Sequence, residues 1–143
     1  MSGYDDRPWL ARYPAGRPAG LTPDFDDALA MFRATVRRDP GAVAIRYFDG
    51  RLTYGELDEL SDAFASALLD DGFRRGDRVG LYLQNVPQFV LALVGTWKAG
   101  GVAVSVNPMN RQRELELLLT DSGATVLVCL ESLYRDVAAE VVP

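Results

Sequence analysis

The chain has 143 residues, of which 48% are hydrophobic and 24% charged, and this is the composition of a globular protein with a buried core. Its net charge of -5 and pI near 4.7 argue against a nucleic-acid-binding protein, which would need a basic stripe on its surface. There is no histidine, so the commonest metal ligand and the usual general base at neutral pH are both absent.

Residues 1–21 are expected to form an extended arm, and residues 22–143 a partial α/β domain. Pro8, Pro14 and Pro18 interrupt the arm, which has no hydrophobic periodicity and does not resemble a signal peptide. No apolar run approaches the length of about 20 residues that a membrane span requires. The single cysteine excludes a disulfide within the chain, which fits a cytoplasmic protein.

A first helix is predicted to begin at Thr22, an N-cap residue that is followed by Pro23 at the first helical position. Asp39–Pro40–Gly41 is predicted to end this helix. The apolar residues that recur at helical spacing between these signals are Phe25, Leu29, Phe32 and Val36.

A β-hairpin and a second helix follow. Val43–Phe48 reads as a strand, and Asp49–Gly50 is a strong signal for a two-residue hairpin turn. Thr53 and Glu56 have the spacing of a capping box, so the helix is predicted to start directly after Thr53. Asp71–Gly72 is predicted to end it.

Three continuously apolar strands then alternate with helices, a pattern that predicts a parallel sheet. The predicted strand–helix pairs are Arg78–Leu83 with Pro87–Ala99, Val102–Val106 with Arg111–Asp121, and Thr125–Cys129 with Ser132–Val141. Pro87–Ala99 is apolar on nearly every side, so we expect neighbours on two of its faces. Gly95, Gly100 and Gly101 are interpreted as glycines that end this helix.

Ligands of open parallel sheets bind outside the carboxyl ends of the strands. These ends are predicted at Gln84–Asn85, Asn107–Pro108 and Leu130–Glu131. Asn85 could donate to a ligand, but we favour a role as the N-cap of the helix that Pro87 opens. Asn107 likewise could contact a ligand, and we favour a turn that directs the next helix.

The remaining polar and reactive residues suggest structural roles. Lys98, the only lysine, lies near a helix end, where the dipole favours a cation. Cys129 stands in the apolar run VLVC and reads as a buried thiol without a base beside it. Asp77, Asp121 and Ser122 read as caps or turn formers. Neither a dinucleotide-binding nor a P-loop glycine motif is present, and we assign no catalytic, cofactor-binding or metal-binding residue.

Residues 51–128 nevertheless resemble the amino-terminal part of the adenylate-forming acyl-CoA ligases. The resemblance lies in an ordered series of short motifs, RLTYGEL, GDRV, NVPQF, KAGGVAVSVNPMN and DSGATVLV. VNPMNRQREL followed by DSGATVLV is most similar to the long-chain fatty acid branch. The resemblance implies the first part of that family's large domain, an α/β fold in which helices flank a parallel sheet with a mixed edge, preceded by an N-terminal hairpin.

Members of this family join a carboxylic acid to ATP, forming an acyl-adenylate and pyrophosphate, and then transfer the acyl group to coenzyme A. Their phosphate loop and catalytic lysine have no counterpart in this sequence. The resemblance therefore implies that ATP, Mg²⁺, coenzyme A and the fatty acid bind with the remainder of a parent chain, itself cytoplasmic or membrane-peripheral. The fragment alone is expected to be inactive and to bind no cofactor.

Two expectations concern the fragment as an isolated molecule. The apolar helix Pro87–Ala99 and the sheet edge would normally meet the rest of a large domain, so we expect the fragment to be a homo-oligomer. The alternative to the ligase hypothesis is a free-standing interaction or small-ligand-binding α/β module without catalysis, because a fold by itself does not confer a function.

Overall fold

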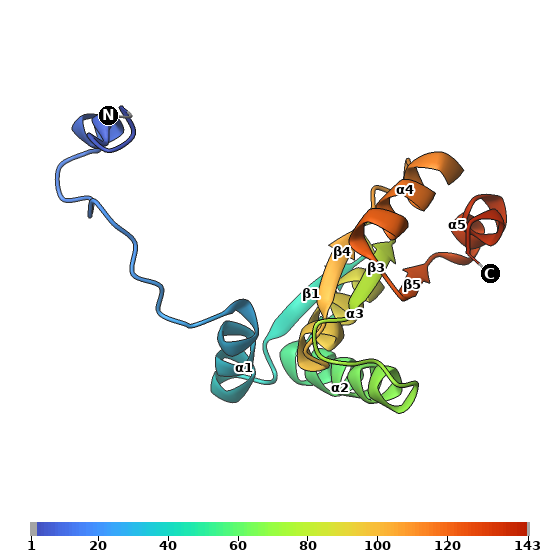
Figure 1. The fold of residues 1–143 in the computed structure, drawn as a ribbon. Coiled ribbons are helices and arrows are strands. Elements are labelled where there is room, and N and C mark those ends of the chain that lie inside the picture. The colour runs from blue at the N-terminus through green and yellow to red at the C-terminus, as the bar shows by residue number, and fades with distance from the viewer. Residues whose placement is uncertain (1–2, 143) are drawn as a thin grey trace.

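A computed structural model describes residues 3–142; the first two residues of the expected arm and Pro143 lie outside the described residues. The described part of the arm extends away from the domain (Figure 1). Its only helical segment is the short 3-10 helix η1 (Pro8–Arg12), and its backbone is otherwise irregular until α1 begins.

Helix α1 (Ala28–Arg38) begins later than the sequence predicts. Its N-cap is Asp27, whose carboxylate accepts a hydrogen bond from the backbone N–H of Ala30 at 2.6 Å. The prediction of a start at Thr22 is therefore wrong. An aspartate caps at least as well as a threonine, and Asp27 stands directly before the helical turns that bury Phe32.

The hairpin pairs β1 (Val43–Tyr47) with β2 (Gly50–Thr53) in an antiparallel sheet of two strands. Its turn consists of Phe48 and Asp49, one residue earlier than predicted, because Gly50 already pairs with Tyr47. Phe48 has a positive φ of 51°. The predicted position of Asp49 in the turn is thus confirmed, whereas that of Gly50 is wrong, because Gly50 belongs to β2.

Helix α2 (Tyr54–Asp70) starts with the predicted capping box. The backbone N–H of Glu56 donates to the Thr53 hydroxyl at 3.2 Å, and the backbone N–H of Thr53 donates to the Glu56 carboxylate at 2.8 Å. Gly72 ends the helix as expected, with a φ of 88° that favours glycine. The predictions for both ends of this helix are therefore confirmed.

Three parallel strands form the main sheet in the order β4-β3-β5, which confirms the predicted parallel sheet. The central strand is β3 (Arg78–Tyr82), with β4 (Val102–Ser105) on one side and β5 (Val126–Cys129) on the other. The hairpin forms a separate sheet. Within the described residues, β4 and β5 are both edge strands, each paired on one side only.

Helices cover both faces of this sheet (Figure 1). On one face, α2 and α3 (Pro87–Lys98) pack over Val79 and Leu81 of β3. On the other face lie α4 (Gln112–Ser122), α5 (Glu131–Asp136) and the 3-10 helix η2 (Ala138–Glu140). Tyr82 and Leu115 are fully buried in this second cluster.

The last predicted helix, Ser132–Val141, is interrupted. The backbone leaves helical geometry at Val137, where φ is -139° and ψ is -57°, and this separates α5 from η2. Val137 is buried, and β-branched residues are poor helix formers.

Helix α3 contacts α2, α1, β3 and β4, which leave its large apolar side chains half-buried or buried. No large apolar side chain of α3 is among the exposed residues, so the expected exposed apolar patch is not seen on this helix. Gly95 makes the contact with α2 possible: a Cβ atom there would lie 2.7 Å from Phe64 Cδ1 and 2.9 Å from the Ser61 carbonyl oxygen. The interpretation of Gly95 as a helix-ending glycine is wrong. Gly100, with a φ of 76°, and Gly101 do end α3, since the Gly101 N–H donates to the Thr96 carbonyl.

Candidate functional site at the carboxyl edge of the sheet

The carboxyl ends of the three parallel strands lie at the same edge of the sheet. The pairing sets Leu81 of β3 beside Ser105 of β4, and Tyr82 of β3 beside Cys129 of β5. The loops that follow these strands therefore emerge side by side. This is the edge where ligands of open α/β sheets bind.

The loop after β4, residues 107–110, is a tightly bonded turn. Asn107 Oδ1 accepts from the Met109 N–H at 2.9 Å, and the Asn107 carbonyl accepts from the Asn110 N–H at 2.9 Å. The predicted turn at Asn107–Pro108 is therefore confirmed. The turn leaves Met109 81% exposed.

Tyr82 connects this loop to the central strand. Its side chain is fully buried, and its hydroxyl donates to the Asn110 carbonyl oxygen at 2.6 Å. Burial raises the pKa of the Tyr82 phenol above its ordinary value of 10.0, so the hydroxyl remains a donor at neutral pH. Sequence reasoning missed this residue, although a tyrosine inside a continuously apolar strand indicates that its hydroxyl needs a partner.

Asn85, after β3, does not cap α3. The N-cap is Val86, which has no capping side chain and an extended backbone with φ of -119°, as expected for a residue before proline. The predicted capping role is therefore wrong. Asn85 is exposed and lines a hollow of about 240 Å³ between β1 and the start of α3, together with Ile45 and Phe89.

The end of β5 offers no activated group. Cys129 is half-buried, and burial raises the pKa of its thiol above 9.0, which disfavours the nucleophilic thiolate. Glu131 already pairs with Arg135, at 2.6 Å, one turn further along α5. Asp77 is also engaged, since its carboxylate accepts from the Arg74 N–H at 2.7 Å and shapes the turn before β3.

Lys98 lies at the opposite end of the sheet, near the residues that precede β3. Its ammonium donates to the carbonyl and the carboxylate of Asp58, at 2.8 and 2.6 Å, and to Asp62 at 2.7 Å. Sequence reasoning placed this lysine at a helix end but did not identify the two aspartates of α2. With its side chain 4% exposed, Lys98 joins two helices. Together with Asp58, Asp62 and Arg33 it lines a hollow of about 250 Å³ between α1 and α2.

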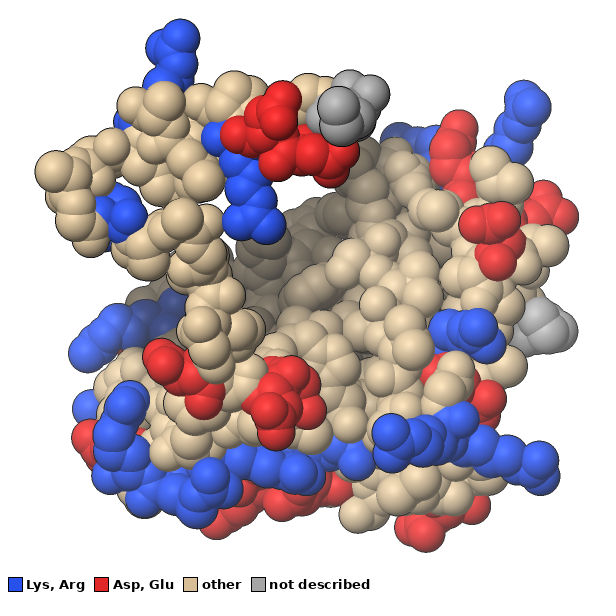
Figure 2. Space-filling view, turned by 60° about the vertical axis from the view of Figure 1, so that its left-hand side comes forward, with Lys and Arg blue, Asp and Glu red and all other residues tan. Residues whose placement is uncertain are grey.

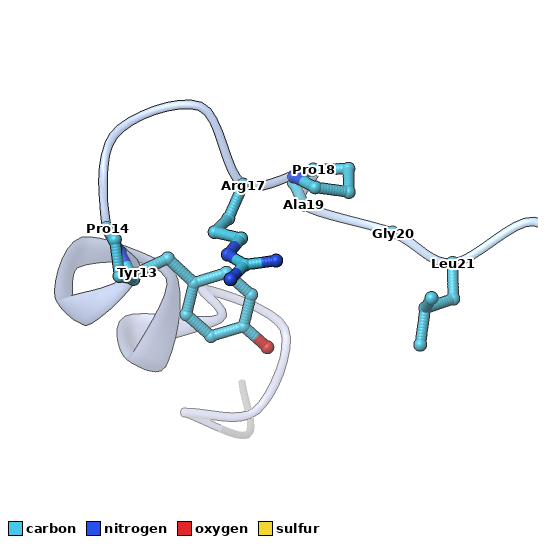
Figure 3. A pocket seen from close by; sticks show the side chains of 7 residues that line it. All are labelled: Tyr13, Pro14, Arg17, Pro18, Ala19, Gly20 and Leu21. Atoms are coloured by element: carbon cyan, nitrogen blue, oxygen red, sulfur yellow. The ribbon is translucent and has the colours of Figure 1, made fainter.

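The larger hollows lie away from the carboxyl edge. One, of about 450 Å³, is lined by the start of α1 together with Arg75 and Trp97. Another, of about 440 Å³, is formed entirely by the arm residues Tyr13–Leu21 (Figure 3). Figure 3 shows the Tyr13 ring beside the Arg17 side chain, and no residue of the domain contributes a wall. The arm therefore does not supply an enclosed site.

Basic and acidic side chains lie close together on the face that Figure 2 shows. Figure 2 shows a band of Lys and Arg along one margin of the domain, with Asp and Glu side chains on both sides of it. Within residues 3–142 no group of three or more Cys, Asp or Glu could hold a metal ion. No helix in this range is long and apolar enough to cross a membrane. We assign these residues no step of adenylate formation.

A family model described as AMP-binding enzyme matches residues 32–142, which is most of the chain. The chain belongs to the AMP-binding enzyme family. This membership confirms the resemblance seen in the ordered motifs of residues 51–128.

Two similar relatives of this AMP-binding family member are named long-chain-fatty-acid–CoA ligases. One, from Yersinia pestis, is 38% identical over 89% of this chain and 23% of the relative. The other, from Escherichia coli O6:H1, is 39% identical over 87% of this chain and 22% of the relative. The chain thus spans less than a quarter of the length of the curated relatives it matches.

A benzoate CoA ligase from Burkholderia xenovorans has a similar fold. It superposes with a TM-score of 0.72 and 28% sequence identity over 77% of this chain and 22% of that chain. This match confirms the predicted α/β fold as part of an acyl-CoA ligase domain.

Proposed function

We propose that this chain forms the amino-terminal part of the large domain of an ATP-dependent long-chain fatty acid–CoA ligase. The observation that carries the proposal is the match of nearly nine-tenths of the chain to enzymes of that name, at 38 to 39% identity. The fold supports it, because the chain superposes on another acyl-CoA ligase.

In this proposal the complete enzyme is cytoplasmic, with or without peripheral membrane association. It activates a fatty acid with ATP and Mg²⁺, releases pyrophosphate, and transfers the acyl group from the adenylate to the thiol of coenzyme A. The sites for ATP, Mg²⁺ and coenzyme A lie outside residues 1–143. The chain supplies the first strands of the sheet and its carboxyl edge, and none of its residues reacts with the substrate. Alone, it is inactive.

We also propose that the isolated chain self-associates through a sheet edge. The apolar helix α3 does not support this proposal, because α1 and α2 pack against it and leave none of its large apolar side chains exposed. The edges of β4 and β5 remain, each paired on one side within the described residues. Unpaired strand edges favour pairing with another chain.

The decisive experiment is a chimaera in which this chain replaces the matched segment of the Escherichia coli relative. We expect palmitate-dependent pyrophosphate release in the presence of ATP, Mg²⁺ and coenzyme A. The chain alone, measured in parallel, should release none above the blank. A chimaera that melts cooperatively yet forms no palmitoyl-adenylate would contradict the proposal.

Calorimetry on the isolated chain separates the ligase proposal from the free-standing module. Saturable binding of ATP or palmitate by the chain alone, together with an inactive chimaera, would favour a small-ligand-binding module.

A further inference from the structure

We infer that Tyr82 is a positioning residue, whose hydroxyl fixes the loop 107–110 at the edge of the sheet where the substrates of the proposed ligase bind. The effect on catalysis rests on the proposed function. The attachment of the loop to β3 through Tyr82 rests only on the geometry of this chain.

The loop is held at both ends by the central strand. At its entry, the Val106 N–H donates to the Leu81 carbonyl at 3.0 Å, continuing the ladder between β4 and β3. At its exit, the Asn110 carbonyl accepts from the Tyr82 hydroxyl at 2.6 Å. The first attachment is ordinary sheet pairing, whereas the second depends on a single side chain.

Tyr82 is suited to hold a loop in place. Its ring is fully buried and packs with Val106, Leu115 and Val137, so the hydroxyl has little freedom to move. The next residue after Asn110 is Arg111, the N-cap of α4. The hydrogen bond therefore also sets the point at which the chain leaves the loop and enters the helix.

The position of the loop should depend on this bond more than the stability of the domain does. Asn110 is half-exposed, so water can satisfy its carbonyl when the tyrosine hydroxyl is removed. No solvent molecule can hold the carbonyl at a fixed distance from β3. Small displacements of groups that line a substrate site reduce rate strongly, even when the fold is intact.

Tyr82→Phe tests the inference, with Thr53→Ala as a destabilising control at a helix cap remote from the loop. In this chain, hydrogen exchange at the amides of Met109 and Asn110 should accelerate about tenfold in Tyr82→Phe and stay unchanged in Thr53→Ala. In the chimaera, kcat/KM for palmitate should fall about tenfold in Tyr82→Phe and less than about twofold in Thr53→Ala.

Unchanged loop exchange in Tyr82→Phe would overturn the inference, as would equal losses of kcat/KM in the two variants. An unmutated chimaera without activity would instead contradict the proposed function. In that case the exchange comparison still decides whether Tyr82 positions the loop.

Discussion

The ammonium of Lys98 lies 2.6 Å from the carboxylate of Asp58, and this pair joins α3 to α2. The Lys98 side chain is 4% exposed and that of Asp58 29%, so the pair is only partly screened by solvent. The same ammonium lies 5.7 Å from the centre of the Phe32 ring, on α1. One cation thus contacts all three helices that cover this side of the domain.

Replacing Lys98 with methionine should lower the free energy of unfolding by about 1–2 kcal/mol, because Asp58 would lose its charged partner in a half-buried site. This expected loss includes little from the pair with Asp62, because that side chain is 65% exposed and solvent screens its charge. Urea denaturation measures the change. The matched control is Arg135→Met, which removes an exposed pair and should cost less than about 0.5 kcal/mol. Equal losses of unfolding free energy in the two variants would show that the partly buried Lys98 pair stabilises the chain no more than the exposed Arg135 pair does.

Gly95→Ala should destabilise the chain, although alanine is the better helix former. The added methyl group would lie 2.7 Å from Phe64 Cδ1 and 2.9 Å from a backbone oxygen, so α2 and α3 must separate. We expect a loss of about 1–3 kcal/mol in chemical denaturation. Gly20→Ala is the control, because nothing lies within 4 Å of a Cβ atom there. A Gly95→Ala variant with an unchanged or raised midpoint would refute the close-packing role.

Local signals in the sequence predicted local structure well. The capping box at Thr53 and the glycine at Gly72 each act within a few residues, so the ends of α2 were readable. The start of α1 was misjudged because Thr22 and Asp27 are both good caps. Only the packing of Phe32 against the rest of the domain selects between them.

Contacts between residues far apart in the sequence could not be predicted from it. Tyr82 and Asn110 are separated by 28 positions, and Lys98 and Asp58 by 40, so no spacing rule connects them. The sequence did predict that the candidate site lies at the carboxyl edge of a parallel sheet, because strand order and helix alternation determine that edge. It could not identify which buried side chain reaches the loop there.

Thr53→Ala should lower the free energy of unfolding by about 1 kcal/mol, within a range of about 0.5–2. The substitution removes the acceptor of the Glu56 N–H and the donor to the Glu56 carboxylate. Thr22→Ala provides the control, since this threonine precedes the true cap of α1 and is exposed. Equal melting temperatures for Thr53→Ala and the unmodified chain would show that the capping interpretation is wrong.

The capping box should also give the chain a pH-dependent stability. Hydrogen bonds from the backbone and the side chain of Thr53 lower the pKa of Glu56 below 4.5. A depressed carboxyl pKa contributes stability above the unfolded-state value, and this contribution is lost as the pH falls through the folded-state value. The melting temperature should therefore exceed that of Glu56→Gln at pH 7, and the gap should narrow below pH of about 4.5. A gap that stays constant down to pH of about 3 would contradict this account.

The isolated chain should associate through the free edge of β4. The N–H groups of Val102 and Val106 donate to the loop before β3 and to β3 itself, so alternate amides such as that of Ser105 point outward. Light scattering at micromolar concentration should give a mass above 15.7 kDa. Ser105→Pro removes an outward donor without breaking the ladder to β3, and it should shift the chain towards the monomer.

The control for Ser105→Pro is Leu117→Ala, which shortens an exposed apolar side chain on α4 and should leave the mass unchanged. A monomer at every dilution would refute edge pairing, whereas a dimer unaffected by Ser105→Pro but lost in Leu117→Ala would assign the contact to α4.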